Sequence, residues 1–390
     1  MGKNFKIVVK TLFGFEELLA EELTKIGALH VKSGQRMVSC EGDTGFLYKA
    51  NLACRTAIKI LKPIHTCKVK DEQSLYDAIY AIDWSAYLNE QQTLAIDATV
   101  FSTHFTHSKY VALKCKDAIV DQFRNKTGIR PSIDTESPDL RLNIHIHENE
   151  CTVSLDSSGL SLHVRGYKTA GHIAPISEVL AAGLLMMSGW EGQCDFYDPM
   201  CGGGTILIEA AMIACNIPPN IHRREFAFER WPDFDKALFE KIKESLLQKT
   251  RDMPFTIFGT DIDFKNVKQS RENIHSAHLE EFIEVRQGDF FQSTKKTEGP
   301  LHILFNPPYD ERISIETEDF HLQIGNTLKR NYPGTKAWMV SANAEALKYV
   351  GLKPSKKIKV YNGSLEARLL LYDIYAGSKR YGSNPLTPEA

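Results

Sequence analysis

Short apolar segments alternate with helical patterns throughout the second half of this 390-residue chain. Strands alternating with short helical crossovers form a parallel, doubly wound sheet. The final segments 357–363 and 367–375 predict a hairpin at one edge of that sheet. The sequence therefore predicts an α/β fold with a C-terminal, doubly wound Rossmann-like domain. Its strands are expected over 194–199, 255–263, 282–289, 301–308 and 337–343, with helices beginning after Ser177 and Gly204 and covering 318–331.

The first half of the chain predicts a mixed α+β region. Strand and helix patterns up to residue 64 follow the order β-α-β-β-α-β if 30–40 holds two strands, which is a ferredoxin-like unit. A helix near Glu72, a strand over 93–101, a helix over 108–126 and a strand pair over 140–157 come next. We expect a ferredoxin-like segment over 1–68, a second region over 69–165, the C-terminal domain over 166–378, and a loose polar tail over 379–390.

Composition limits the class of protein. The chain is 43% hydrophobic and 25% charged, as in ordinary globular proteins. No apolar run reaches the roughly 18 residues of a membrane span, and the N-terminus has no secretory core. Eight scattered cysteines form no C-x-x-C pair, which favours reduced thiols and no metal site. We expect a cytoplasmic protein without a membrane partner.

Charge is unevenly distributed along the chain. Residues 1–70 carry 12 Lys and Arg against 6 Asp and Glu, although the whole chain has a net charge of −2. A basic N-terminal region suits a polyanion partner, and it is also compatible with a solvated surface.

A glycine-rich turn follows the first predicted strand of the C-terminal domain. In DPMCGGGT, residues 198–205, three consecutive glycines allow the backbone to approach a ligand closely. The segment is neither a dinucleotide fingerprint, because Leu207 stands at the third glycine position, nor a P-loop, because G-K-[ST] is missing. By itself it is compatible with a tight turn.

Acidic residues follow the next two strands. Asp261 can accept hydrogen bonds from ribose hydroxyls, or Asp261 or Asp263 can cap the next helix. Asp261 lies 63 residues after Asp198, where about 20 is usual, which indicates an insertion over 216–253. Asp289, with Phe290 beside it, can accept from the exocyclic amine of adenine, or can act as a cap.

The strand 301–308 ends in Asn306, Pro307, Pro308 and Tyr309. A central strand cannot continue through two prolines, because each lacks the N–H that the ladder requires. The Asn306 side-chain oxygen and the Pro307 carbonyl could both accept from one –NH₂ group, and Tyr309 offers a stacking face for a base. A proline-rich turn is the alternative. Because three compatible strand ends precede it, we interpret this motif as a cradle for a planar amine.

This combination resembles the class I S-adenosylmethionine-dependent methyltransferases, in which NPPY marks enzymes that methylate exocyclic or amide nitrogens. RGYKTAGHIAPISEVLAAGLL, FAFERWPDF and NGSLEARLLLY resemble the bacterial large-subunit-rRNA guanine-N2 methyltransferases of type L. Residues 69–165 then resemble a THUMP domain, an RNA-binding module. The resemblance implies S-adenosylmethionine as cofactor and Asn306, Pro307, Pro308 and Tyr309 as catalytic residues. It implies a cofactor site made of Asp198, Pro199, Cys201, Gly202, Gly203, Gly204, Thr205, Asp261, Ile262, Asp289, Phe290 and Asn306.

Within the insertion, cationic and aromatic residues interleave. Arg223, Arg224 and Arg230 suit RNA near the active site, whereas Phe226, Phe228 and Trp231 could simply pack the insertion onto the domain; both interpretations remain open.

The resemblance implies methyl transfer to the N2 amine of a guanosine in 23S rRNA, with RNA as partner. A THUMP-bearing tRNA guanine-N2 methyltransferase is one alternative. A non-catalytic RNA-binding ribosome assembly factor is another. A DNA adenine-N6 enzyme shares NPPY, but the RNA-like N-terminal half argues against it.

Overall fold

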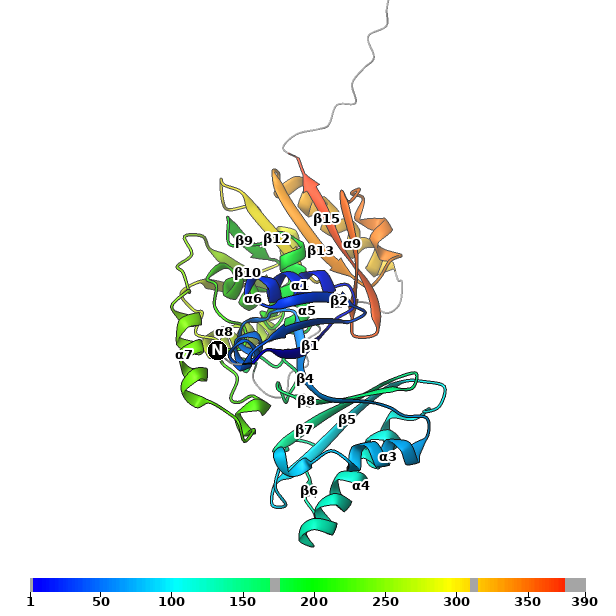
Figure 1. Cartoon of the computed structure of the whole chain (residues 1–390). Coiled ribbons are helices and arrows are strands. Elements are labelled where there is room, and N and C mark those ends of the chain that lie inside the picture. Colours follow the sequence, from blue (N-terminus) through cyan, green and yellow to red (C-terminus); the bar gives the residue numbers. More distant parts are fainter. Residues whose placement is uncertain (1–2, 169–175, 309–314, 376–390) are drawn as a thin grey trace, which may run out of the picture. The chain divides into compact units, whose positions relative to one another are not determined.

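The computed structural model describes residues 3–168, 176–308 and 315–375 (Figure 1). The chain divides into two compact units. The first unit comprises Met1–Lys168, Glu178–Gly183 and Asn216–Arg251, and the second comprises Thr169–Ser177, Leu184–Cys215 and Asp252–Ala390. The predicted insertion therefore groups with the N-terminal residues rather than with the domain whose sequence it interrupts.

An eight-stranded sheet forms the first unit, in the order β2-β3-β1-β4-β8-β7-β5-β6. The helices α3 and α4 pack together beside β5 (Figure 1). The strands are β1 (Phe5–Thr11), β2 (Leu29–Gly34), β3 (Met37–Gly42), β4 (Ala57–Lys68), β5 (Thr93–Phe101), β6 (Ser132–Ile133), β7 (Leu140–His147) and β8 (Glu150–Asp156). The helices are α1 (Glu16–Lys25), α2 (Thr44–Ala53), α3 (Glu72–Tyr80), α4 (Ser108–Thr127), α7 (Lys236–Leu247) and the short η1 (Trp84–Ala86) and η2 (Ala227–Arg230).

One long strand, β4, lies in the first predicted N-terminal region and pairs with strands of both. Its first half pairs with β1, with Lys10 opposite Lys59, and its second half pairs with β8, with Lys68 opposite Glu150. The two strands predicted within 30–40 correspond to β2 and β3, which complete the ferredoxin-like order. The expected boundary at residue 68 thus coincides with the end of a shared strand rather than with a linker.

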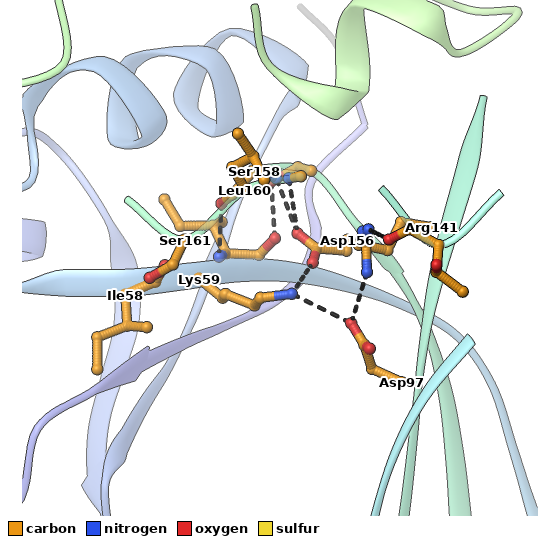
Figure 2. Close-up of polar contacts among 12 residues, drawn as sticks. Ile58, Lys59, Asp97, Arg141, Asp156, Ser158, Leu160 and Ser161 are labelled. Atoms are coloured by element: carbon orange, nitrogen blue, oxygen red, sulfur yellow. Dashed lines mark hydrogen bonds and ion pairs between the residues drawn. The ribbon is translucent and has the colours of Figure 1, made fainter. Parts of the chain in front are cut away.

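A network of ion pairs connects the strands where these two regions meet (Figure 2). The Lys59 ammonium lies 2.7 Å from Asp156 and 3.3 Å from Asp97, and Arg141 lies 3.1 Å from Asp97. The Asp156 side chain is only 1% exposed and also accepts from the backbone N–H groups of Ser158 and Gly159. These partners supply the hydrogen bonds that a side chain this deeply buried has lost from water.

A seven-stranded sheet forms the second unit, in the order β11-β10-β9-β12-β13-β15-β14. The first five strands in that order are parallel, and β15 and β14 are antiparallel at the edge, which confirms the predicted fold class. The strands are β9 (Asp195–Asp198), β10 (Ile257–Asp261), β11 (Ile283–Gln287), β12 (Leu301–Phe305), β13 (Thr335–Ser341), β14 (Lys356–Asn362) and β15 (Leu365–Ile374). The helices are α6 (Thr205–Ala214), α8 (Phe264–Ser276), α9 (Ile315–Asn331), η3 (Phe290–Gln292) and η4 (Ala346–Val350). The residues of α5 (Glu178–Met187) are divided between the two units after Gly183.

The central strand β12 is buried along its whole length and ends at Phe305, three residues earlier than predicted. Asn306 and the two prolines lie beyond the ladder, as the missing proline N–H groups require. The core beneath this strand end includes Tyr197, Ile324 and Tyr332. Each parallel strand therefore ends at one common edge, where its following loop can contribute to a site.

Candidate active site

The glycine turn between β9 and α6 needs glycine at two positions. Gly202 has φ +52° and Gly204 has φ +79°, both in the left-handed region that favours glycine. A Cβ on Gly204 would lie 2.3 Å from Oγ of Ser270 in α8, so this position also excludes any side chain. Asn273, one turn further along α8, donates to the Gly203 carbonyl over 2.8 Å. The turn is therefore held tightly against α8.

Asp261 ends β10 and joins this strand end to the glycine turn. Its Oδ2 accepts from the backbone N–H of Gly202 over 2.9 Å. Its Oδ1 accepts from the backbone N–H of Asp263 over 3.0 Å and from Nδ2 of Asn266 over 3.1 Å. The residue Asp261 is 8% exposed. The alternative in which Asp263 caps the next helix is also realised, because its Oδ1 accepts from the Lys265 N–H.

Asp289 and Phe290 lie in the loop after β11. Asp289 caps η3, because its Oδ1 accepts from the Phe291 N–H over 2.9 Å. The Phe290 ring is buried against Phe305 and Tyr332, with ring centroids 5.8 and 5.7 Å apart. Asp289 therefore acts as a helix cap, which is one of its two predicted roles. Its contact with an adenine amine stays a prediction.

These strand ends surround one cavity of about 300 Å³. Asn306 is half-buried, Pro307 is buried and Pro308 is exposed, and all three line it. Tyr309 lies outside the described residues. The predicted site residues that line the cavity are Pro199, Gly202, Asp261, Ile262, Asp289, Phe290, Asn306, Pro307 and Pro308.

The cavity also contains residues that the sequence did not identify. Asn266 lies five residues after Asp261, and Phe291 follows a predicted pair, so their spacing could have drawn attention to them. Phe320, on α9, stands edge-to-face against Phe291 at 5.4 Å, and no local motif marks it. Conversely, five predicted site residues of the glycine turn do not line the cavity: Asp198, Cys201, Gly203, Gly204 and Thr205.

Comparisons with known proteins identify the family. Residues 165–370 match the model of the RMKL-like methyltransferase domain, 69–156 match the THUMP domain, and 6–61 match the RlmL ferredoxin-like domain. The first of these models covers more than half of the chain. The chain belongs to the RMKL-like methyltransferases.

Full-length relatives agree with this membership. A Synechocystis sp. protein that is named as a candidate RNA methyltransferase is 39% identical over 366 residues, which is 93% of this chain and 95% of the relative. The crystal structure of SMU.472, which is named as a candidate methyltransferase complexed with SAH, has a TM-score of 0.85 at 27% identity, and the match covers 97% of this chain and 100% of that chain. A Listeria monocytogenes structure named as an N6-adenine-specific DNA methylase has a TM-score of 0.84 at 27% identity, and the match covers 95% of this chain and 97% of that chain.

This RMKL-like protein is thus an RNA methyltransferase with a THUMP domain, and S-adenosylmethionine is its cofactor. The cavity fits such a cofactor chemically. Asp261 keeps an acceptor position for a ribose hydroxyl, Ile262 exposes 70% of its surface as an apolar contact for a base, and Gly202 has no side chain that would fill the cavity.

Two buried groups of the methyltransferase next to the cavity have shifted pKa values. Burial, followed by the nearby Asp261 charge, raises the pKa of Asp198 to about 8, although a hydrogen bond from the Met200 N–H opposes the shift. Burial also raises the pKa of the Cys201 thiol well above its usual value, which makes it a poor nucleophile.

No group of three or more His, Cys, Asp or Glu side chains in 3–168, 176–308 and 315–375 could hold a metal ion. Over the same residues, no helix has the length and apolar character required to cross a bilayer.

The insertion of the methyltransferase is packed by its aromatic residues. Phe228 is fully buried and stacks on Tyr48 with centroids 4.5 Å apart, and Phe226 and Trp231 are buried in the same cluster. These three aromatic residues therefore pack the insertion, which is one of the two interpretations of the sequence.

The arginines of the insertion differ in their contacts. The Arg223 guanidinium donates to the backbone carbonyls of Ser158, Leu160, Ser161 and Val164, and burial lowers its pKa to about 10. Arg230 donates to the Ser137 carbonyl and pairs with Glu225, whereas Arg224 is exposed. RNA contact by these residues stays a prediction, and Arg224 has the most accessible side chain.

Proposed function

We propose that the protein transfers a methyl group to the exocyclic N2 amine of a guanosine in large-subunit (23S) rRNA. The observation that carries this proposal is the placement of Asn306 and Pro307 in the same cavity as Gly202, Asp261 and Asp289. This placement supports the proposal that the Asn306 side-chain oxygen and the Pro307 carbonyl would accept from the target amine beside the cofactor. The resemblance to the type L guanine-N2 enzymes supplies the choice of base and RNA.

We base the proposed division of labour on the cavity lining and on the family resemblance. Gly202 would contribute to the methionine side, together with Asp198, which is buried and does not line the cavity. Asp261 would bind the ribose, and Asp289 with Phe290 and Ile262 would contact the adenine. When bound, S-adenosylmethionine supplies a methyl group on a positively charged sulfur. Asp261, Asp263 and Asp289 give the cavity negative charge, which favours that positive charge electrostatically.

Asn306 and Pro307 would activate the acceptor. The lone pair of an arylamine is delocalised into its ring, so the amine is a poor nucleophile. Acceptors on both N–H bonds favour a pyramidal nitrogen, and this contact strengthens in the transition state. Because the ring fixes φ of Pro307 and the following Pro308 restricts its ψ, the Pro307 carbonyl would be held in place before the base arrives. The methylated amine is acidic while it carries its extra proton, so no strong base is required.

The target guanosine has to leave its base pair to reach the cavity, which suits an unpaired or flipped nucleotide. The THUMP domain and the basic N-terminal region would hold RNA by shape and phosphate contacts. A cytoplasmic location, where ribosomal RNA is found, is part of the same proposal.

A tRNA guanine-N2 activity remains the nearest alternative, because the same cavity would serve either RNA. The Listeria structure's name favours a second candidate, adenine-N6 methylation of DNA. The match to a THUMP domain over 69–156 supports RNA instead. A non-catalytic assembly factor is disfavoured by the intact cavity with Asp261 and Asn306.

Nucleoside mass spectrometry of a strain that lacks the gene tests the proposal. Loss of N2-methylguanosine from 23S rRNA alone is expected. Loss from tRNA alone would favour the first alternative, and loss of N6-methyladenosine from DNA would favour the second. An unchanged nucleoside profile in all three nucleic acids would contradict an enzymatic role.

A further inference from the structure

The Asp261 carboxylate has little hydrogen-bonding capacity left for a ligand. A carboxylate offers about four acceptor positions on its two oxygens. Oδ1 already accepts from Asp263 and from Asn266, and Oδ2 accepts from Gly202. One position therefore remains, on Oδ2. The cofactor's ribose carries two neighbouring hydroxyls, so one of them needs a different acceptor.

Asn266 is placed to be that acceptor. It lines the cavity together with Asp261. A carboxylate can only accept, so the atom of Asn266 that faces Asp261 is fixed as the amide nitrogen. The carbonyl oxygen Oδ1 must then point away from Asp261, and in the part of the chain that the structure describes it has no hydrogen-bond partner.

The helix α8 fixes the position of Asn266. Three polar residues, Asn266, Ser270 and Asn273, follow one another at helical spacing and therefore lie on one face of α8. Asn266 donates to Asp261, Ser270 lies against Gly204, and Asn273 donates to the Gly203 carbonyl. The cap by Asp263 fixes where this helix begins. Asn266 is the member of this polar stripe that lies at the cavity.

We propose that Asn266 is a ribose-binding residue of the cofactor site, with Asp261 Oδ2 accepting from one ribose hydroxyl and Asn266 Oδ1 from the other. This inference rests on the assignment of the cavity to the cofactor, which the proposed function shares. It does not depend on which base or which RNA is methylated.

Calorimetric titration of the full chain with S-adenosylhomocysteine and with its 2′-deoxy and 3′-deoxy analogues tests the inference. The variants are Asn266→Ala and, as a control, Lys268→Ala, an exposed residue on the same helix that does not line the cavity. Loss of one neutral hydrogen bond should weaken S-adenosylhomocysteine binding by roughly 3- to 10-fold in Asn266→Ala. Lys268→Ala should bind like the wild type, and the unfolding midpoint of each variant verifies the fold.

The deoxy analogues separate direct contact from an indirect effect. For the analogue that lacks the hydroxyl bound by Asn266, wild type and Asn266→Ala should agree within about 2-fold, whereas the other analogue should show the full loss. An equal loss for all three ligands would overturn the inference, because it would mean that Asn266 acts only by orienting Asp261. Unchanged affinity for S-adenosylhomocysteine would also overturn it.

The test distinguishes failure of this inference from failure of the proposed function. Binding is measured without RNA, so an incorrect choice of guanine or of 23S rRNA would leave every titration unchanged. A wild-type protein that fails to bind S-adenosylhomocysteine would overturn the cofactor site, and this inference with it.

Discussion

The backbone N–H of Gly202 donates to Oδ2 of Asp261 over 2.9 Å. This single bond links the turn after β9 to the end of β10, two segments that are 59 residues apart in the chain. The bond places the Gly202 backbone, which has no side chain, next to the Asp261 carboxylate. A glycine turn next to an acidic residue at the carboxyl edge of a parallel sheet is typical of nucleotide-binding sites.

Substitutions in the glycine turn should separate ligand binding from folding. In Gly202→Ala the added methyl meets nothing within 4 Å, so we expect about 1–2 kcal/mol of backbone strain and a clear loss of S-adenosylhomocysteine affinity, because Gly202 lines the cavity. In Gly204→Ala the methyl collides with Ser270, so the loss of unfolding free energy should be larger.

Urea unfolding and ligand titration of both variants measure these effects. Gly204→Ala combined with Ser270→Ala should recover part of the lost stability, because the colliding hydroxyl is removed. Equal stability of the two single variants would contradict this account of the turn.

Asn306→Ala should abolish methylation while leaving cofactor binding largely in place. Removing one preorganised polar group that acts on the transition state lowers rates by roughly 10²–10³-fold in well-studied enzymes. Single-turnover methyl transfer measures the rate, and titration with S-adenosylhomocysteine measures binding. Asn306→Asp, which keeps an acceptor oxygen, is the matched variant and should retain more activity. A near-normal rate in Asn306→Ala would mean that the amine cradle is wrong.

The stability of the second unit should depend on pH through His302. Its ring stacks on Phe196, its Nε2 lies 2.9 Å from Oγ of Ser188, and burial, followed by the Lys336 charge, lowers its pKa from 6.5 to about 4. Between these values the unfolded chain binds a proton that the folded protein does not. The contribution of neutral His302 to the free energy of unfolding is therefore present above pH 6.5. It falls by at most about 3 kcal/mol as the pH decreases towards 4.

Urea unfolding at pH 7, 6, 5 and 4.5 measures this slope. His302→Gln keeps a hydrogen-bonding group and removes the titration, so its stability should fall less over this range. The same slope in the variant and the wild type would exclude His302 as a source of the acid sensitivity.

Lys59→Met should destabilise the first unit by about 3 kcal/mol. The substitution removes the cation that lies 2.7 Å from the buried Asp156 carboxylate, and an uncompensated buried charge is strongly destabilising. Lys348→Met is the control, because Lys348 and its partner Glu345 are both more than half exposed and such pairs contribute at most about 1 kcal/mol. Similar unfolding free energies for the two variants would contradict the importance assigned to the network.

The sequence predicted those features that depend on local chemistry. The paired prolines had to end β12, the three glycines had to form a turn, and alternating buried strands had to form a parallel sheet. Because the carboxyl ends of such strands share one edge, the sequence predicts that Gly202, Asp261, Asp289 and Asn306 lie close together, and all four line one cavity.

Features that depend on long-range packing could not be predicted in this way. The insertion groups with the N-terminal residues because Phe228 stacks on Tyr48, 180 residues earlier, and no local pattern encodes that partner. Phe320 enters the cavity from a helix beyond the NPPY segment, and β4 pairs with strands of both N-terminal regions. Each of these features depends on which distant surfaces meet, and periodicity does not specify that.

Methyl transfer by the purified protein tests the central claim most directly. The protein is incubated with methyl-deuterated S-adenosylmethionine and, separately, with 23S rRNA, tRNA and DNA from a strain that lacks the gene, and the nucleosides are analysed by mass spectrometry. Deuterated N2-methylguanosine from 23S rRNA, and its absence with Asn306→Ala, is the predicted result. Label in N6-methyladenosine, or N2-methylguanosine only from tRNA, would contradict it.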